Sequence, residues 1–466
     1  MNRELKELEK AIELIHAQAK EFGLDFFPVH FELCPADVIY TFGAYGMPTR
    51  FSHWSFGKAF YKMKLQYDYN LSRIYELVIN NNPCYAFLLE GNSLIQNKLV
   101  IAHVYGHSDF FKNNYRFSST HRQMVETMAI HAAKIREYEF KYGFREVEIF
   151  LDAALSIQEH IEPPGLASGK AEGDADKEEG APPPATPYDD LWALDRKEAT
   201  NDKNERNRKF PRHPQKDVLA FIMKHAVDLE EWQRDILAML HEEMRYFWPQ
   251  LETKILNEGW ATYWHNRIMR SLDLNEDEAV EFARLHAMIL QPGRMQINPY
   301  YVGFKILEDI ERRWDKPSAE ERERYGRAGE EGRQKIFEVR ATETDISFLR
   351  NYLTKDLVEE LDLYLYQKID KEWVVVEKDW EKVRDGLVDR LVNCGFPYIV
   401  VADADYQRRG ELYLLHKYEG LELDVPYLEK TLHHVYLLWG RPVHLETVLD
   451  GKPAVFSYDG KKNTRR

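Results

Sequence analysis

The sequence predicts an α+β protein with a large, mainly helical body, an aromatic-rich core and a smaller α+β C-terminal domain. Apolar residues recur at helical spacing from about residue 215 to 315. After about residue 345, short runs rich in Val, Tyr and Leu indicate strands. The chain also contains 27 Tyr, 24 Phe and 10 Trp. Because aromatic side chains bury large areas, we expect them to fill the interfaces between helices.

Within the body, helices are expected over residues 69–80, 99–114 and 118–142, and Asn80-Asn81-Asn82-Pro83 is expected to end the first of them. A polar stretch over 316–335 predicts a solvated helix or linker. In the C-terminal part a helix is expected over 378–393, and Asp450-Gly451 predicts a hairpin turn. Strands are expected over 372–377, 397–402, 411–416, 443–448 and 454–458.

These patterns predict two domains, a mainly helical body over residues 1–335 and a small α+β domain over 345–460. An acidic, Pro-rich stretch at about 162–188 has almost no apolar residue. Such a composition cannot bury enough surface to order itself, so we expect a disordered insertion inside the body.

Composition also excludes several classes of protein. The net charge of -15 argues against a nucleic-acid-binding surface, which needs clustered cations. Three cysteines without a CxxC pair indicate neither a disulfide framework nor a thiolate zinc site. The charged start of the chain lacks a signal-peptide core, and no apolar run approaches the ~20 residues of a membrane span. We therefore expect a cytoplasmic protein without a membrane span.

The first candidate for chemistry is the pair His103 and His107. Histidines four residues apart lie on one face of a helix, where both imidazoles can reach one metal ion. In a zincin the motif HExxH adds a glutamate as general base. Val104 occupies that position here, so a conventional zincin mechanism cannot operate from this helix.

A second candidate lies in the segment 257–265, where Glu258, Thr262 and His265 share one helical face. A carboxylate and an imidazole that face the same way can ligate a metal or act as an acid/base pair. The Glu-Gly-Trp-Ala run resembles the helix that supplies the third zinc ligand in some gluzincin metallopeptidases.

The segment His241-Glu242-Glu243-Met244-Arg245 imitates HExxH, but Arg245 cannot ligate a metal. Glu242 is an acid/base group or a carboxylate ligand from a neighbouring helix, or else part of a solvated helix face. His286 is read as a hydrogen-bonded core residue rather than a ligand. Glu76 and Glu90 are further acids near the first pair, and nothing in the spacing singles either out.

These residues lead to two hypotheses. In the first, His103, His107 and Glu258 hold zinc or another divalent metal, and Glu242 or His265 acts as acid/base in a degenerate, gluzincin-like hydrolase. In the second, the same side chains form a buried polar network that fixes the register of the helices in a non-catalytic scaffold or regulator.

Five blocks of sequence together resemble the SpoVR family, named for stage V sporulation protein R. They are the residues 50–58, 107–114, 246–250, 257–265 and 297–304. The resemblance spans nearly the whole chain, and the insertion at 162–188 departs from it. It implies a cytosolic protein that acts in formation of the spore cortex, the modified peptidoglycan of the endospore. It also implies a PrkA-type serine protein kinase and a von Willebrand A-like protein as partners. The resemblance brings no established catalytic residues.

Overall fold

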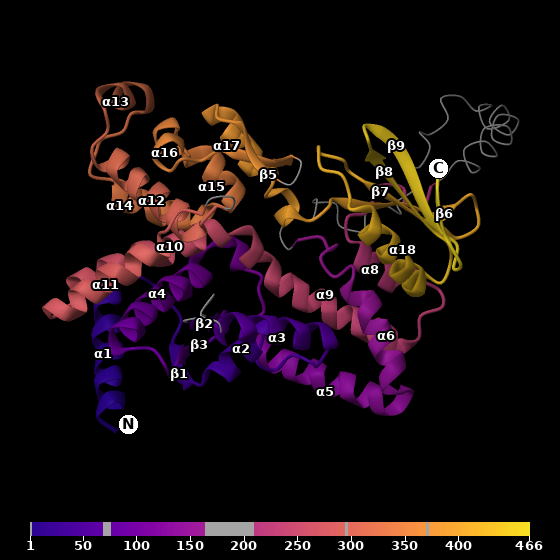
Figure 1. Cartoon of the computed structure of the whole chain (residues 1–466), viewed down its shortest axis with the longest axis horizontal. Helices are drawn as coiled ribbons and strands as arrows, with labels where there is room; N and C mark the ends of the chain where they lie inside the picture. Colours follow the sequence, from indigo (N-terminus) through magenta and orange to yellow (C-terminus); the bar gives the residue numbers. More distant parts are fainter. Residues whose placement is uncertain (1, 69–75, 164–208, 294–296, 370–371) are drawn as a thin grey trace, which may run out of the picture. The chain divides into compact units, whose positions relative to one another are not determined.

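The computed structural model describes residues 2–68, 76–163, 209–293, 297–369 and 372–466 (Figure 1). They form two compact units, of which the first joins Met1–Arg136 to Tyr246–Gly395 and the second joins Glu137–Arg245 to Phe396–Arg466. The segment 345–395, expected in the C-terminal domain, thus belongs to the first unit. From residue 164 onward, the expected insertion at 162–188 lies outside the described residues.

The core of the first unit is formed by three helices, α4 (Leu94–Asn113), α10 (Lys254–Ser271) and α12 (Pro299–Asp315). Helix α4 is buried on nearly every side from Ile95 to Phe111, as expected of a helix that is apolar all round. The first unit also contains the helices α1 (Asn2–Glu21), α2 (Ala36–Tyr45), α3 (Trp54–Asp68), α11 (Glu276–Ile289), α13 (Ala319–Tyr325), α14 (Gly332–Thr342), α15 (Asp345–Tyr352), α16 (Lys355–Glu360) and α17 (Trp380–Asp389).

A small sheet in the first unit has the strand order β1-β3-β2, with β1 (Val29–Cys34) parallel and β2 (Glu76–Ile79) antiparallel to β3 (Cys84–Leu89). The expectation of a helix over 69–80 is therefore wrong at residues 76–79, and residues 69–75 lie outside the described part. The run Glu76-Leu77-Val78-Ile79 is rich in β-branched residues, and pairing with buried β3 stabilises it as a strand. A second ladder joins β4 (Leu365–Ile369) to β5 (Glu372–Glu377).

Glycines allow the three core helices to approach closely. A Cβ atom added at Gly106 of α4 would lie 2.7 Å from Ala261 Cα of α10. One added at Gly259 of α10 would lie 2.4 Å from the carbonyl carbon of Gly303 in α12. Because backbone atoms cannot yield as side chains do, any larger residue here has to separate the helices.

We expect Gly259→Ala to lower the free energy of unfolding by at least the ~1–3 kcal/mol typical of overpacking, because the new methyl meets backbone. Gly57 of α3 is the matched control, since a Cβ there meets nothing within 4 Å. Gly57→Ala is expected to stabilise the chain by about 0.5–1 kcal/mol, because alanine is the better helix former. Urea unfolding of both variants measures the difference, and equal stabilities would contradict this packing.

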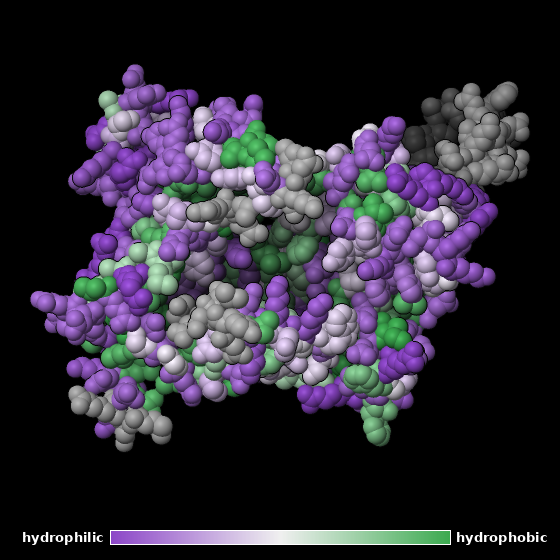
Figure 2. Space-filling view, viewed as in Figure 1, coloured by the Kyte–Doolittle hydropathy of each residue, from purple (hydrophilic) through white to green (hydrophobic). Residues whose placement is uncertain are grey.

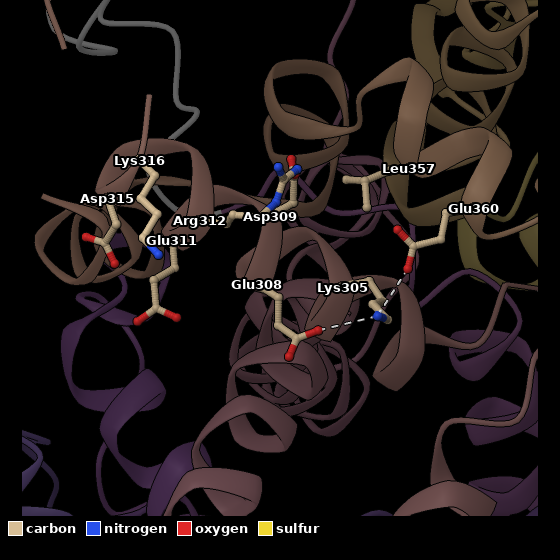
Figure 3. Close-up of a pocket in the computed structure, with 9 residues that line it drawn as sticks. All are labelled: Lys305, Glu308, Asp309, Glu311, Arg312, Asp315, Lys316, Leu357 and Glu360. Carbon is tan, nitrogen blue, oxygen red and sulfur yellow. Dashed lines mark hydrogen bonds and ion pairs between the residues drawn. The ribbon is translucent and has the colours of Figure 1, made fainter. Parts of the chain in front are cut away.

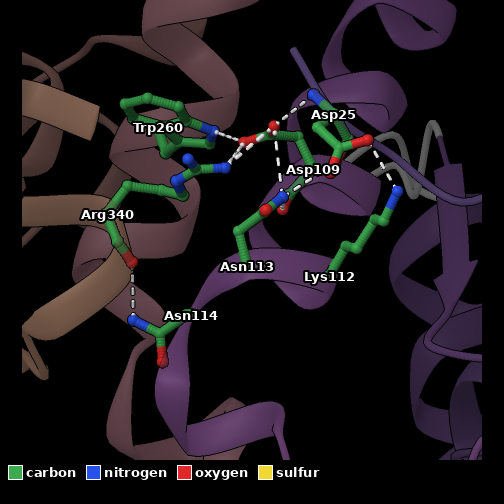
Figure 4. A network of polar contacts seen from close by, with 7 residues as sticks. All are labelled: Asp25, Asp109, Lys112, Asn113, Asn114, Trp260 and Arg340. Carbon is green, nitrogen blue, oxygen red and sulfur yellow. Dashed lines mark hydrogen bonds and ion pairs between the residues drawn. The ribbon is translucent and has the colours of Figure 1, made fainter. Parts of the chain in front are cut away.

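A buried carboxylate, Asp109 of α4, also links these helices (Figure 4). Its two oxygens lie 3.0 and 2.9 Å from Arg340 Nη1 of α14. The indole N–H of Trp260 in α10 and the backbone N–H of Asp25 donate to the same carboxylate, both at 2.8 Å. Burial raises the pKa of Asp109 to about 6, although Arg340 opposes that shift. This network ties α4, α10 and α14 together with hydrogen bonds that leave the carboxylate fully paired.

The second unit contains a mixed five-stranded sheet of strand order β10-β9-β8-β7-β6, in which β7 and β8 are parallel and the other neighbours are antiparallel. Its strands are β6 (Ile399–Tyr406), β7 (Glu411–His416), β8 (Val443–Leu449), β9 (Lys452–Tyr458) and β10 (Asn463–Arg465). Helix α18 (Val425–Trp439) packs on β8 and β9 and against α6 (Phe144–Leu155), while α8 (Val218–His225) contacts β6. Helices α5 (Met124–Tyr142) and α9 (Glu231–Glu252) contain the unit boundaries.

The expected turn at Asp450-Gly451 is confirmed, because β8 and β9 pair there as an antiparallel hairpin. Both residues have positive φ, 51° and 70°, as a two-residue type I′ turn requires. The expected strands over 372–377, 411–416, 443–448 and 454–458 are likewise confirmed.

The polar stretch expected over 316–335 contains α13, which buries none of its residues. Figure 2 shows hydrophilic residues almost throughout the region that α13 occupies in Figure 1. Within the described ranges, no helix combines the length and apolar character needed to cross a membrane.

Candidate metal centre

Four side chains of the first unit converge at the face of α4. Glu76 Oε1 lies 3.4 Å from His103 Nε2 and 3.9 Å from His107 Nε2. Glu258 Oε2 lies 3.5 and 3.4 Å from the same two nitrogens. We call these four residues, Glu76, His103, His107 and Glu258, the metal cluster.

Three elements, α4, α10 and β2, position the four members of the cluster. One turn of α4 separates His103 from His107, so their rings project side by side with centroids 4.6 Å apart. Close contact at Gly106 and Ala261 brings α10 against that turn and places Glu258 beside both rings. Pairing of Glu76 with Leu88 sets the register of β2 on β3 and carries the second carboxylate to the cluster.

The spacing of the cluster fits a metal ion. Four ligand atoms at about 2.0–2.1 Å around a tetrahedral zinc lie about 3.3–3.4 Å from one another, close to the separations between Nε2 and carboxylate atoms here. Two of these atoms, His103 Nε2 and Glu258 Oε2, are buried without a hydrogen-bond partner. Buried polar atoms are nearly always paired, so this pair of orphan atoms is itself a sign of a missing ligand. Imidazole and carboxylate are the donor types that zinc accepts.

Side chains behind the cluster hold the two imidazoles in place. His107 Nδ1 lies 2.9 Å from Asn257 Oδ1, so it donates to that oxygen and leaves Nε2 directed at the carboxylates. His103 Nδ1 lies 2.9 Å from His265 Nδ1, and His265 Nε2 lies 3.0 Å from His286 Nδ1. Histidine ligands in metal sites usually have such partners on their second nitrogen.

The surroundings shift the pKa values of the cluster in opposite directions. Burial raises the pKa of Glu76. Burial acts on Glu258 in the same sense, yet the imidazoles of His103 and His107, 3.5 and 3.4 Å away, hold the pKa of Glu258 far below the usual range. Burial opposes charge on His107, but the carboxylates of Glu258 and Glu76 raise its pKa to about 9. The two acids therefore differ in their affinity for a proton, with Glu76 the stronger acceptor.

Two histidines behind the cluster have lowered pKa values, in contrast to His107. Burial lowers the pKa of His265 well below its usual value, and burial also lowers the pKa of His286 to about 4. In the unfolded chain both have a pKa near 6.5, so below that pH the unfolded state binds more protons. These two histidines are expected to lower the melting temperature of the metal-free protein as the pH falls from about 6.5 towards 4, so His286→Asn should lose less than the wild type over that range. Calorimetry of both chains measures the difference, and identical pH profiles would contradict these environments.

Comparison with known proteins identifies the family. A family model described as SpoVR like protein matches residues 2–396, and one described as SpoVR-like C-terminal domain matches residues 397–450. The chain belongs to the SpoVR family. It is 31% identical over 461 residues to the uncharacterized protein YcgB of Escherichia coli (strain K12), covering 92% of this chain and 89% of that protein. No solved structure matches. Membership places this SpoVR protein among sporulation-associated proteins.

Three of the residues predicted as ligands in this SpoVR protein, His103, His107 and Glu258, do lie together. His265 lies on the same face of α10 as Glu258, as its spacing predicted. Both of its ring nitrogens, however, contact other histidines. Its acid/base role stays a prediction. Glu242 lies on α9 in the second unit, and its catalytic role also stays a prediction. In the same helix, His241 Nε2 lies 2.8 Å from Asp217 Oδ2.

Glu76 is the member of the cluster that sequence reasoning did not single out. The reason is that a helix was expected over 69–80. A strand prediction would have placed Glu76 at the start of an element that pairs with β3. The other nearby acid, Glu90, is exposed at the turn after β3. A pairing prediction for the β-branched run 76–79 was the signal that could have identified Glu76.

A pocket elsewhere in this SpoVR unit has a different character (Figure 3). It has a volume of about 480 Å³ and lies along α12. Lys305 Nζ lies 3.5 Å from Glu308 and 3.1 Å from Glu360, while Asp309 pairs with Arg313 at 2.6 Å. Because these acids are matched by neighbouring cations, we assign no site to this pocket.

Proposed function

We propose that this SpoVR protein is a metal-dependent hydrolase whose centre is the metal cluster, and that it acts in formation of the spore cortex. The observation that carries the proposal is the pair of buried, unpartnered atoms His103 Nε2 and Glu258 Oε2, which face each other beside His107 and Glu76. The separations of 3.5 and 3.4 Å between Glu258 Oε2 and the two Nε2 atoms support one ion of the size of zinc. The association of the family with sporulation supports the cortex as the place of action.

Roles within the cluster follow from geometry. Glu258 approaches both imidazole nitrogens almost equally, at 3.5 and 3.4 Å, and we assign it with His103 and His107 to hold the ion. A bound divalent ion supplies a water whose pKa is lowered to about 7. Glu76 is the carboxylate of the cluster that is not assigned as a ligand. We assign it as the general base, in place of the HExxH glutamate whose position Val104 occupies here. In this assignment Glu76 takes up the proton at Oε1, and Asn257 keeps His107 Nε2 directed inward.

Substitution of the two acids separates these roles. Glu258→Gln is expected to lose the metal, whereas Glu76→Gln is expected to retain it and lose hydrolysis by about 10²–10⁴-fold, the range of a general base. The measurement combines metal content by mass spectrometry with release of soluble fragments from purified peptidoglycan by the zinc-loaded full chain. Loss of metal in Glu76→Gln alone would reverse the two roles. Absence of metal in a wild-type chain purified without chelator would overturn the whole proposal.

The same assay distinguishes the alternative function. A chain that binds zinc through the cluster but releases no fragments would contradict the hydrolase assignment. That result is expected of a non-catalytic scaffold or regulator, in which a metal or a polar network only fixes the register of α4 and α10.

A further inference from the structure

Three histidines form a continuous hydrogen-bonded chain that starts at the metal cluster. His103 of α4 contacts His265 of α10 through the two Nδ1 atoms at 2.9 Å, and His265 Nε2 contacts His286 Nδ1 of α11 at 3.0 Å. His103 and His265 are buried, while His286 is half-buried. We call His103, His265 and His286 the histidine relay.

The far end of the relay is fixed in place and reaches the surface. The ring of His286 stacks near Phe282, with centroids 5.8 Å apart, and meets Phe304 edge-on at 5.7 Å. His286 also lines a groove of about 690 Å³ with Met269, Leu272 and Leu274. The last ring of the relay therefore has one nitrogen committed to His265 and lies beside a hollow of the surface.

A chain of N–H···N bonds between neutral imidazoles has only two directions, because each imidazole carries one N–H. When His103 donates to His265 and His265 donates to His286, the lone pair of His103 lies on Nε2, where a metal needs it. When the direction is reversed, His103 Nε2 carries the hydrogen and faces the carboxylates of Glu76 and Glu258. Only the first direction is compatible with a metal ligand.

We propose that His265 and His286 are positioning residues that set the tautomer of His103. Each N–H of the relay is donated towards His286 when the cluster holds a metal, and towards His103 when it does not. The change moves protons without changing the charge of any ring. His103 releases its Nε2 hydrogen on the cluster side, one hydrogen passes along each of the two N···N contacts, and His286 Nε2 takes up one hydrogen at its outer side. This proposal rests on the proposed metal centre and adds residues that the ligand set does not include.

Two substitutions of His286 test the relay through metal affinity. His286→Phe keeps the aromatic packing but removes the acceptor for His265, and we expect it to weaken zinc binding by the about 10–100-fold typical of a lost outer partner. In His286→Asn the amide oxygen takes the place of Nδ1, so the acceptor is restored and we expect the affinity of the wild type. Competition with a chromophoric chelator measures the three affinities for zinc alone, and calorimetry checks that each chain is folded.

Equal affinities of wild type and His286→Phe would overturn the relay, as would an Asn variant as weak as the Phe variant. A second readout needs no variant: nitrogen-15 spectra of labelled histidines should show His265 with Nε2–H in the zinc-loaded chain and Nδ1–H in the metal-free chain. The same tautomer in both states would also overturn the relay. A wild-type chain that binds no zinc would instead remove the metal centre first, so the two failures are distinguishable.

Discussion

Replacing His107 by asparagine is expected to weaken zinc binding by more than the about 10–100-fold that loss of an outer partner causes, because a ligand itself is removed. The substitution is chosen for its shape. An asparagine amide occupies the position of the Nδ1 half of the ring, so it can still donate to Asn257 Oδ1, as His107 Nδ1 does at 2.9 Å. It lacks only the Nε2 atom that faces Glu258 and Glu76.

The measurement is zinc affinity by chelator competition, with cobalt absorption as a check on the ligand field. His121→Asn is the matched control, since His121 is exposed and lies outside the metal cluster. We expect the control to bind zinc as the wild type does. An affinity for zinc in His107→Asn within error of the control would mean that zinc binds elsewhere in the chain.

The largest effect on stability is expected at Arg340. Replacing it by methionine leaves Asp109 buried with a carboxylate that only N–H donors face, and removal of one partner from a buried ion pair typically lowers the free energy of unfolding by about 3–5 kcal/mol. Part of the loss is relieved because burial already raises the pKa of Asp109 to about 6, so the acid can be protonated more easily. We therefore expect a smaller loss at pH values below about 6 than at neutral pH.

Denaturant unfolding at both pH values tests this expectation. Lys355→Met is the control, because Lys355 lies 3.7 Å from Glu359 on the surface of α16, with side chains 61% and 66% exposed. Such surface pairs contribute about 0–1 kcal/mol. Similar stabilities for the two variants would show that Asp109 and Arg340 do not form the buried pair described here.

The sequence predicted helices and turns well where one local signal dominates. Periodic apolar residues predicted the helical region from about 215 to 315 that contains α10, and Asp450-Gly451 predicted a hairpin whose backbone indeed adopts positive φ at both positions. The helix prediction was wrong at Glu76–Ile79, where a strand forms because it pairs with β3 and not because of a local sequence pattern. The C-terminal strands were recognised, but the joining of 137–245 with 396–466 in one unit depends on contacts distant in sequence.

The candidate site was predictable to the extent that helical spacing determines it. Spacing of four residues placed His103 and His107 side by side, and spacing of seven placed Glu258 and His265 on one face of α10. Spacing could not show that this face meets α4, which depends on the close contact at Gly106. For the same reason it could not reveal that His286, read as a hydrogen-bonded core residue, has His265 as its partner.

The most direct test of the metal centre is anomalous diffraction at the zinc edge from crystals of the full chain grown with zinc. We expect one strong peak within about 2.0–2.2 Å of His103 Nε2, His107 Nε2 and Glu258 Oε2, with Glu76 facing it. A zinc peak elsewhere in the chain, with none among these four side chains, would contradict it.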